Sequence, residues 1–221
     1  CPVTEFLDAF EVIPPAGAPA YLERLLAICE TKKVRVILPL SEPEILFLNT
    51  IREVFEQRGI CLALNSEYTL STFFDKFRTV QHIASLGYAV PKTILLEDGT
   101  TCLPLPFIVK PRRGCGSRGI AIVDTKAAYD YFKQRHKSGF IVQELIGNDN
   151  HEYTTGIFSD GNHTASITFR RILSKGGYSQ EVHLVSDDHI KALAVDLAAS
   201  IKLEGSINIQ TRKVDGIHIP F

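Results

Sequence analysis

The segment from residue 107 to residue 123 most strongly constrains how this chain can fold and what it can bind. An apolar strand ends at Lys110, a loop rich in glycine and arginine follows, and Ile120–Val123 is apolar again. Glycines let backbone N–H groups approach phosphate oxygens, and lysine and arginine supply positive charge. The segment therefore predicts a phosphate-covering loop between two antiparallel strands, with an ordinary glycine-rich hairpin and a solvated basic tip as the alternative. The loop residues of interest are Gly114, Gly116, Ser117 and Gly119.

Two common nucleotide motifs are excluded by the order of residues in this segment. In a P-loop the lysine follows the glycines, whereas Lys110 precedes them. In a dinucleotide-binding fold a helix follows the glycine turn, whereas the residues after Gly119 read as a strand. We also find no Gly-x-Gly-x-x-Gly pattern in residues 1–70, which argues against a dinucleotide-dependent oxidoreductase.

Composition narrows the class of protein further. The 221 residues are 45% hydrophobic and 22% charged with a net charge of −1, which is typical of a globular protein and unlike a general nucleic-acid binder. No apolar run reaches membrane-spanning length, and no signal peptide is recognisable, so we predict a cytoplasmic protein. The cysteines suggest reduced thiols, and neither they nor the seven histidines show metal-ligand spacing. The chain has no methionine and begins and ends within predicted domains, so we expect a piece of a longer protein.

Residues 1–70 alternate between predicted strands and helices. Strands are expected at 9–13, 34–38 and 61–64, and helices at 20–30 and 42–58. Apolar strands separated by helices indicate a parallel sheet covered by helices. The loop 39–44 lies at a strand's carboxyl end, so its glutamates either face a substrate or simply favour the start of a helix.

Residues 71–221 combine helices with antiparallel strands. A helix is expected from Phe74 to Leu86, and another near 126–136. Residues 152–159 and 163–173 read as a hairpin, as do residues 206–213 and 217 onward. We predict three parts, with a lobe at 71–140 and a second lobe at 141–221 following the domain at 1–70.

Four features follow one another in an informative order. They are Asp75-Lys76, then Lys110 with its glycine loop, then residues 142–147 with Glu152, and then residues 206–210 ending at Gln210. In this order they resemble the ATP-grasp superfamily, most closely its carbamoyl-phosphate-synthase-like branch of carboxylate–amine ligases. The resemblance implies an ATP-grasp fold of two α+β lobes, preceded by a partial Rossmann-like pre-ATP-grasp domain.

The resemblance also implies roles for individual residues. Lys76 and Lys110 would contact ATP phosphates, and Gly114, Gly116, Ser117 and Gly119 would form a lid. Gln143, Glu144 and Ile146 would face the adenine edge, while Glu152 would accept hydrogen bonds from the ribose. Gln210 would lie at a magnesium (or manganese) site. Arg171 would reach a phosphate or a substrate carboxylate, as arginine geometry allows, and Lys110 and Arg171 would be the catalytic residues.

One part of the family pattern is not within the sequence. The family's Glu-x-Asn metal motif is expected just after Phe221.

From the resemblance we predict an ATP- and magnesium-dependent ligase that activates a carboxylate as an acyl phosphate and joins it to an amine. The alternatives are a small-molecule kinase on the same fold and a non-catalytic ATP-binding module. The partners expected are small-molecule carboxylate and amine substrates and a second copy of the chain in a homodimer.

Overall fold

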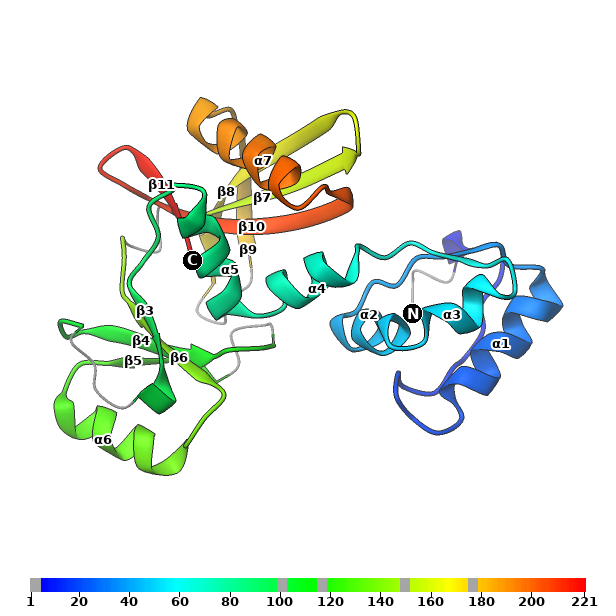
Figure 1. The fold of residues 1–221 in the computed structure, drawn as a ribbon, viewed down its shortest axis with the longest axis horizontal. Helices are drawn as coiled ribbons and strands as arrows, with labels where there is room; N and C mark the ends of the chain where they lie inside the picture. The colour runs from blue at the N-terminus through cyan, green and yellow to red at the C-terminus, as the bar shows by residue number, and fades with distance from the viewer. Residues whose placement is uncertain (1–4, 99–102, 115–118, 148–151, 175–178) are drawn as a thin grey trace. The chain divides into compact units, whose positions relative to one another are not determined.

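The computed structural model describes residues 5–98, 103–114, 119–147, 152–174 and 179–221. Its contacts divide the chain into two compact units, Cys1–Leu64 and Asn65–Phe221. Figure 1 colours the chain from one end to the other. None of the described helices is both long and apolar enough to cross a membrane.

The first unit is a small parallel sheet covered by helices. Its elements are α1 (Tyr21–Lys32), β1 (Val36–Ile37), α2 (Glu42–Asn49), α3 (Arg52–Glu56) and β2 (Cys61–Leu62). The strands β1 and β2 pair in parallel, with Val36 opposite Cys61, as the alternation of strands and helices predicts. The buried residues of the core are Tyr21, Cys29, Leu48, Phe55 and Ile60.

Two expectations for this unit are wrong in detail. Residues 9–13 form no strand, because they are mostly exposed and Glu11 instead pairs with Arg24 and Lys32 of α1. The helix expected at 42–58 is broken between α2 and α3. At the break Thr50 donates its hydroxyl to the carbonyl of Phe47, a local bond that competes with helix continuation.

The loop 39–44 has a structural role in the described contacts. Ser41 caps α2 by accepting a hydrogen bond from the Glu44 N–H at 3.4 Å. The carboxylate of Glu44 accepts a hydrogen bond from the Tyr21 hydroxyl at 2.8 Å. These bonds favour the helix-start interpretation of the loop over the substrate interpretation.

The second unit begins with two helices and a four-stranded antiparallel sheet. The helices are α4 (Glu67–Phe73), which the sequence analysis did not predict, and α5 (Lys76–Ser85). The sheet has the order β3-β6-β4-β5 and is packed by α6 (Lys126–Arg135). Its strands are β3 (Thr93–Leu95), β4 (Phe107–Pro111), β5 (Ala121–Val123) and β6 (Phe140–Glu144).

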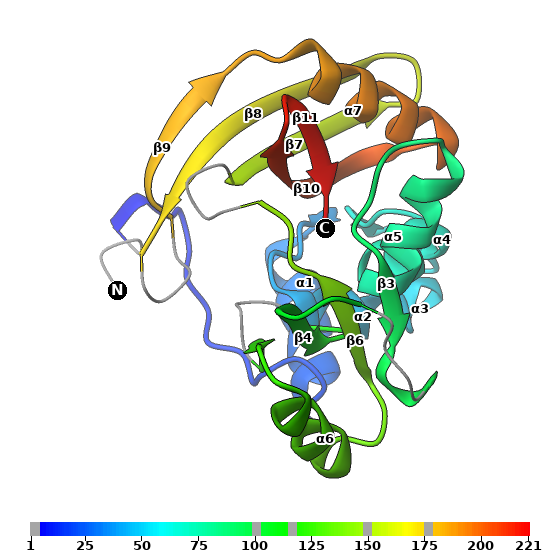
Figure 2. The same cartoon turned by 90° about the vertical axis from the view of Figure 1, so that its left-hand side faces the viewer.

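The remaining strands form a five-stranded antiparallel sheet with the order β11-β10-β7-β8-β9. Figure 2 shows α7 (Asp188–Ser200) lying over this sheet, where Leu193 and Leu197 pack with Ile157 and Ile209. The strands are β7 (Glu152–Asp160), β8 (Thr164–Leu173), β9 (Ser179–Val185), β10 (Glu204–Val214) and β11 (Ile217–Pro220). Strand β9 was not predicted; its residues are mostly exposed, and it is formed by antiparallel pairing with β8. Strand β6 pairs with both β3 and β4 in the four-stranded sheet. The lobe boundary at 140/141 stays a prediction.

Candidate functional site

Lys110 is a buried cation near the end of β4. Lys110 is only 5% exposed, and its ammonium lies 5.3 Å from the centre of the Phe221 ring. Among the described residues it has no hydrogen bond and no ion pair. Burial, together with the nearby cations Lys76 and Arg212, lowers its pKa to about 8, while the Glu152 carboxylate acts in the opposite direction. An anion that binds next to this ammonium would strongly stabilise its charged form.

Lys76 is placed beside Lys110 by the start of α5. Its backbone N–H donates to the carbonyl of Arg112 at 2.9 Å, and its ammonium donates to the carbonyl of Gly114 at 2.6 Å. The structure thus brings the two predicted phosphate lysines together from elements that lie 34 positions apart in sequence. The Gly114 contact also joins Lys76 to the glycine-rich loop.

A buried ion pair that the sequence analysis did not assign holds this arrangement. Asp75 is 1% exposed and accepts from Arg112 Nε at 2.8 Å on both carboxylate oxygens. The same carboxylate caps α5 through the N–H groups of Phe77 and Arg78. Burial acts to raise the Asp75 pKa, but the hydrogen bonds and charge of Arg112 outweigh it and leave the pKa below its usual value. The signal in the sequence was an aspartate directly before a helix and an arginine two residues after Lys110.

The glycine loop is described only at its two ends. Gly114 has φ +103° and Gly119 has φ +74°, both in the left-handed region that favours glycine. A Cβ on Gly119 would lie 3.0 Å from the Pro111 ring, so the backbone at Gly119 passes close to the end of β4. Gly116 and Ser117 lie outside the described residues, and the lid role of all four stays a prediction.

The residues predicted to face adenine lie at the end of β6. The Gln143 amide is buried and donates to the Thr93 hydroxyl at 2.8 Å, while the Glu144 carboxylate accepts from the Lys92 N–H at 3.1 Å. Both side chains therefore tie β6 to the start of β3. The carbonyl of Ile146 accepts from Arg212 Nη1 at 3.1 Å.

Glu152 lies between two arginines across three strands. In the register of the sheet it is opposite Arg212 of β10 and Arg171 of β8. Its carboxylate oxygens lie 3.2 Å from Arg212 Nη2 and 3.4 Å from Arg171 Nη1, and the residue is 5% exposed. Arg171 also donates from Nε to the Ser179 hydroxyl at 2.8 Å. A carboxylate has about four lone-pair positions, so Glu152 retains acceptor capacity for a ligand hydroxyl.

Gln210 is exposed and precedes Arg212 by two positions on β10, so both side chains lie on the same face of the sheet. That face is opposite the one covered by α7, to which Ile209 belongs. The amide oxygen of Gln210 is one hard donor suited to magnesium, which is fewer than a magnesium site needs. Within the described residues no group of three or more histidines, cysteines or carboxylates comes together for a metal.

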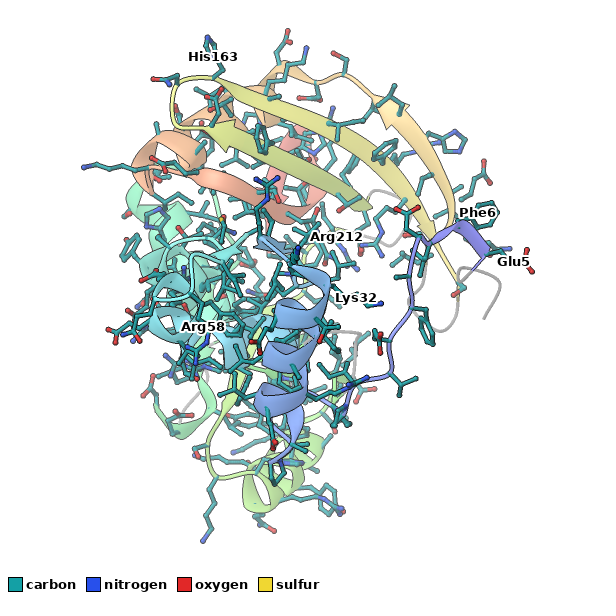
Figure 3. The ribbon with its side chains drawn as sticks, turned by 90° about the vertical axis from the view of Figure 1, so that its right-hand side faces the viewer. Glu5, Phe6, Lys32, Arg58, His163 and Arg212 are labelled. Carbon is teal, nitrogen blue, oxygen red and sulfur yellow. The ribbon has the colours of Figure 1, made fainter. Side chains whose placement is uncertain are left out.

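Arg212 and Phe221 are further members of this cluster that the sequence analysis missed. Figure 3 labels Arg212 below the sheet, away from His163 at the tip of the β7–β8 hairpin. The ring of Phe221 lies 5.4 Å from the Arg212 guanidinium and also contacts Lys110. Strand alternation from Gln210 to Arg212 was the available signal. Lys76 and Lys110 make a pair of cations suited to a polyphosphate, and Arg212, which is paired with Glu152, lies close enough to lower the pKa of Lys110.

Two family models match the chain. Residues 73–211 match the family described as ATP-grasp domain, and residues 1–63 match the PylC-like N-terminal domain. Because the first match covers more than half of the chain, this chain belongs to the ATP-grasp family. The family and fold predicted from the ordered motifs are thereby confirmed.

Solved structures share this fold at low sequence identity. N5-carboxyaminoimidazole ribonucleotide synthetase from Thermus thermophilus is 18% identical with a TM-score of 0.69, over 90% of this chain and 56% of that one. The biotin carboxylase domain of Hydrogenobacter thermophilus 2-oxoglutarate carboxylase, solved with MgADP, ADP and bicarbonate, is 16% identical with a TM-score of 0.74, over 98% and 54%. D-alanine–D-alanine ligase from Bacillus anthracis, complexed with ATP, is 18% identical with a TM-score of 0.65, over 90% and 70%.

These likenesses establish the fold. The chain spans little more than half the length of the first of these structures. No curated protein sequence matches the chain.

Proposed function

We propose that this chain is the ATP-binding part of an ATP- and magnesium-dependent ligase that joins a carboxylate to an amine. The observation that carries the proposal is Lys110, a buried ammonium without an ion pair among the described residues, beside Lys76 and Arg212. Such a cluster is costly to keep in a fold unless an anion completes it. A triphosphate supplies that anion, and family membership favours ATP.

In this proposal each predicted residue keeps its role. Lys76 and Lys110 neutralise the phosphates, and Gly114, Gly116, Ser117 and Gly119 cover them and exclude water. The chain segment at Gln143, Glu144 and Ile146 receives the purine, and Glu152 accepts from the ribose hydroxyls. Gln210 would contribute one oxygen to magnesium, which would offset phosphate charge when bound.

The reaction needs no nucleophile from the protein. A substrate carboxylate oxygen attacks the γ-phosphorus of ATP. The bond between the γ-phosphorus and the β,γ-bridging oxygen breaks, so that ADP departs and an acyl phosphate is formed. The amine then attacks the acyl carbon, phosphate departs, and the nitrogen loses a proton. Lys110 stabilises charge on the transferring phosphoryl group, and Arg171 is proposed to orient the carboxylate.

The support from relatives concerns those proteins themselves. One is described as a D-alanine–D-alanine ligase with ATP, and another as a carboxylase domain with MgADP and bicarbonate. These descriptions favour activation of a carboxylate or of bicarbonate by ATP. A cytoplasmic location and a homodimer complete the proposal. A small-molecule kinase and a binding-only module remain the alternative functions.

The test is ADP release by the full-length protein with MgATP, scanned over pools of amino acids, other carboxylates, bicarbonate and ammonia. We expect ADP only when a particular carboxylate and amine are both present, together with phosphate and an amide. Lys110→Ala should lower the rate by about 100-fold or more, as loss of a preorganised charge contact does. Lys137→Ala, at an exposed lysine, is the matched control and should not change it.

Two other outcomes would contradict the ligase proposal. A stable phosphorylated product without an amide would identify a kinase. ATP binding that depends on Lys110, with no ADP from any pool, would identify a binding module.

A further inference from the structure

Arg212 connects two segments that flank the proposed nucleoside site. It lies on β10, opposite Glu152 in the register of β7. One arm of its guanidinium, Nη1, donates to the carbonyl of Ile146 at 3.1 Å. The other arm, Nη2, donates to Glu152 Oε2 at 3.2 Å. A single side chain therefore holds the segment that follows β6 and the first residue of β7.

The aliphatic part of Arg212 adds a packing contact to the same segment. Gly147 has φ +59°, and a Cβ at this position would lie 3.4 Å from Arg212 Cβ and 3.6 Å from Arg212 Cδ. The backbone at Gly147 therefore packs against the arginine stem at ordinary van der Waals distance, and its positive φ is a conformation that favours glycine. The ring of Phe221, 5.4 Å from the guanidinium carbon, contacts the same side chain.

The chemistry of arginine suits this bridging position better than that of lysine. A planar guanidinium offers several donors in a fixed geometry, so it bonds a carbonyl and a carboxylate at once. A lysine ammonium is a point charge on a flexible chain and lacks that fixed fork. The Glu152 bond is also charge-assisted, which makes it stronger than a bond between neutral groups.

We propose that Arg212 is a positioning residue that fixes the base and ribose end of the nucleotide site. It sets the backbone at Ile146 against the purine edge and orients the Glu152 carboxylate toward the ribose. This inference rests on the proposed ATP-binding function, since Ile146 and Glu152, which Arg212 binds, are residues proposed to contact the nucleoside. Because the phosphates are held by Lys76 and Lys110, loss of Arg212 should affect recognition of the base more than recognition of the phosphates.

The test is calorimetric binding of MgATP and MgGTP to the full-length protein and its variants. Arg212→Gln should weaken ATP binding by about tenfold or more, as expected for loss of hydrogen bonds to a charged group. It should also lower the preference for ATP over GTP, since the purine edge is no longer held in one place. Arg212→Lys keeps the charge and should still lower the preference, because it lacks the fork.

Two control variants separate base recognition from general damage. Lys110→Ala should weaken both nucleotides and leave the ATP-to-GTP preference unchanged, because both carry the same phosphates. Arg135→Gln removes an exposed arginine on α6 and should change neither quantity. If Arg212→Gln does not fold, Arg212→Lys alone carries the same prediction for the preference.

The outcomes distinguish this role from the proposed function. If the unmodified protein does not bind ATP, the proposed function is wrong and the role of Arg212 fails with it. If the protein binds ATP and both Arg212 variants keep the same affinity and preference, only the role of Arg212 is wrong. A drop in affinity with an unchanged preference would also overturn it, because that result indicates charge alone.

Discussion

The two faces of the five-stranded sheet differ in how their cations are paired with carboxylates. Strand β10 presents Arg212 on one face and its neighbour Lys213 on the other. On the first face Arg212 and Arg171 share a single carboxylate, Glu152, and Lys110 lies close by with no ion pair among the described residues. On the second face Lys213 is neutralised by Asp187 at 2.8 Å.

The neutralised face is built around Asp187. Its carboxylate caps α7 through the N–H groups of His189 and Ile190, and it also contacts His218 Nε2 at 3.1 Å. Burial acts to raise the Asp187 pKa, but its bonds to Lys213 and His218 outweigh burial and hold the pKa well below its usual value. His218 completes the group by contacting the Thr211 hydroxyl from its other ring nitrogen.

The comparison teaches how to separate structural charges from functional ones in this protein. Where a cation is paired with a carboxylate that also caps a helix, as Lys213 is with Asp187 and Arg112 is with Asp75, we interpret the pair as stabilising the fold. Where cations outnumber the carboxylates among the described residues, as around the buried Lys110, the fold carries a cost that a ligand can offset. Three experiments on these groups can break or sharpen that distinction.

The largest expected effect is at Asp75. Asp75→Ala removes a helix cap and leaves Arg112 without its carboxylate, so the free energy of unfolding should fall by about 3–5 kcal/mol. Urea denaturation measures it. Asp188→Ala, at an exposed carboxylate in the first turn of α7, should change stability by less than about 0.5 kcal/mol. Equal losses in the two variants would contradict a structural role for the Asp75 pair.

A smaller effect of opposite sign is expected at Lys110. Lys110→Met removes a buried ammonium, so in the absence of ATP the free energy of unfolding at pH 7 should rise by about 1–3 kcal/mol. The lysine pKa is about 8 in the fold and 10.5 as its ordinary value, so the unfolded chain binds more protons between these pH values. Stability of the unmodified protein should therefore rise across that window, and the advantage of Lys110→Met should shrink. A loss of stability in this variant would show that the cation is structural.

The smallest effect is expected from His218. Burial is the main cause that lowers its pKa below 6.5, with Lys213 and His189 adding to it, while Asp187 acts in the opposite direction. The unfolded chain then binds more protons just below pH 6.5, so stability should fall as the pH drops through that value. His218→Gln should flatten this part of the curve of unfolding free energy against pH. An unchanged slope would mean that other groups, such as His82, cause the loss.

Local patterns predicted most of the elements near the site. The apolar residues around Val109, the glycines after Lys110 and the Asp-Gly turn at 215–216 led to β4, its loop and the β10–β11 hairpin. The errors lie where local pattern and packing disagree. Residues 9–13 look like a strand but pair with no strand among the described residues, and β9, whose residues are mostly exposed, is formed by antiparallel pairing with β8.

The sequence by itself determined the family and the order of the motifs, and it singled out Lys76 and Lys110 as the predicted phosphate contacts, because these depend on residue types and their spacing. Only the tertiary structure decided which charges are neutralised. The pairing of Asp75 with Arg112, and of Glu152 with Arg171 and Arg212, joins residues from separate strands and helices. Spacing along the chain does not encode those distances, because they depend on strand register and helix packing in the folded protein. For that reason Lys110 and Arg112 differ although they are two residues apart: among the described residues Lys110 has no ion pair, whereas Arg112 is paired with Asp75.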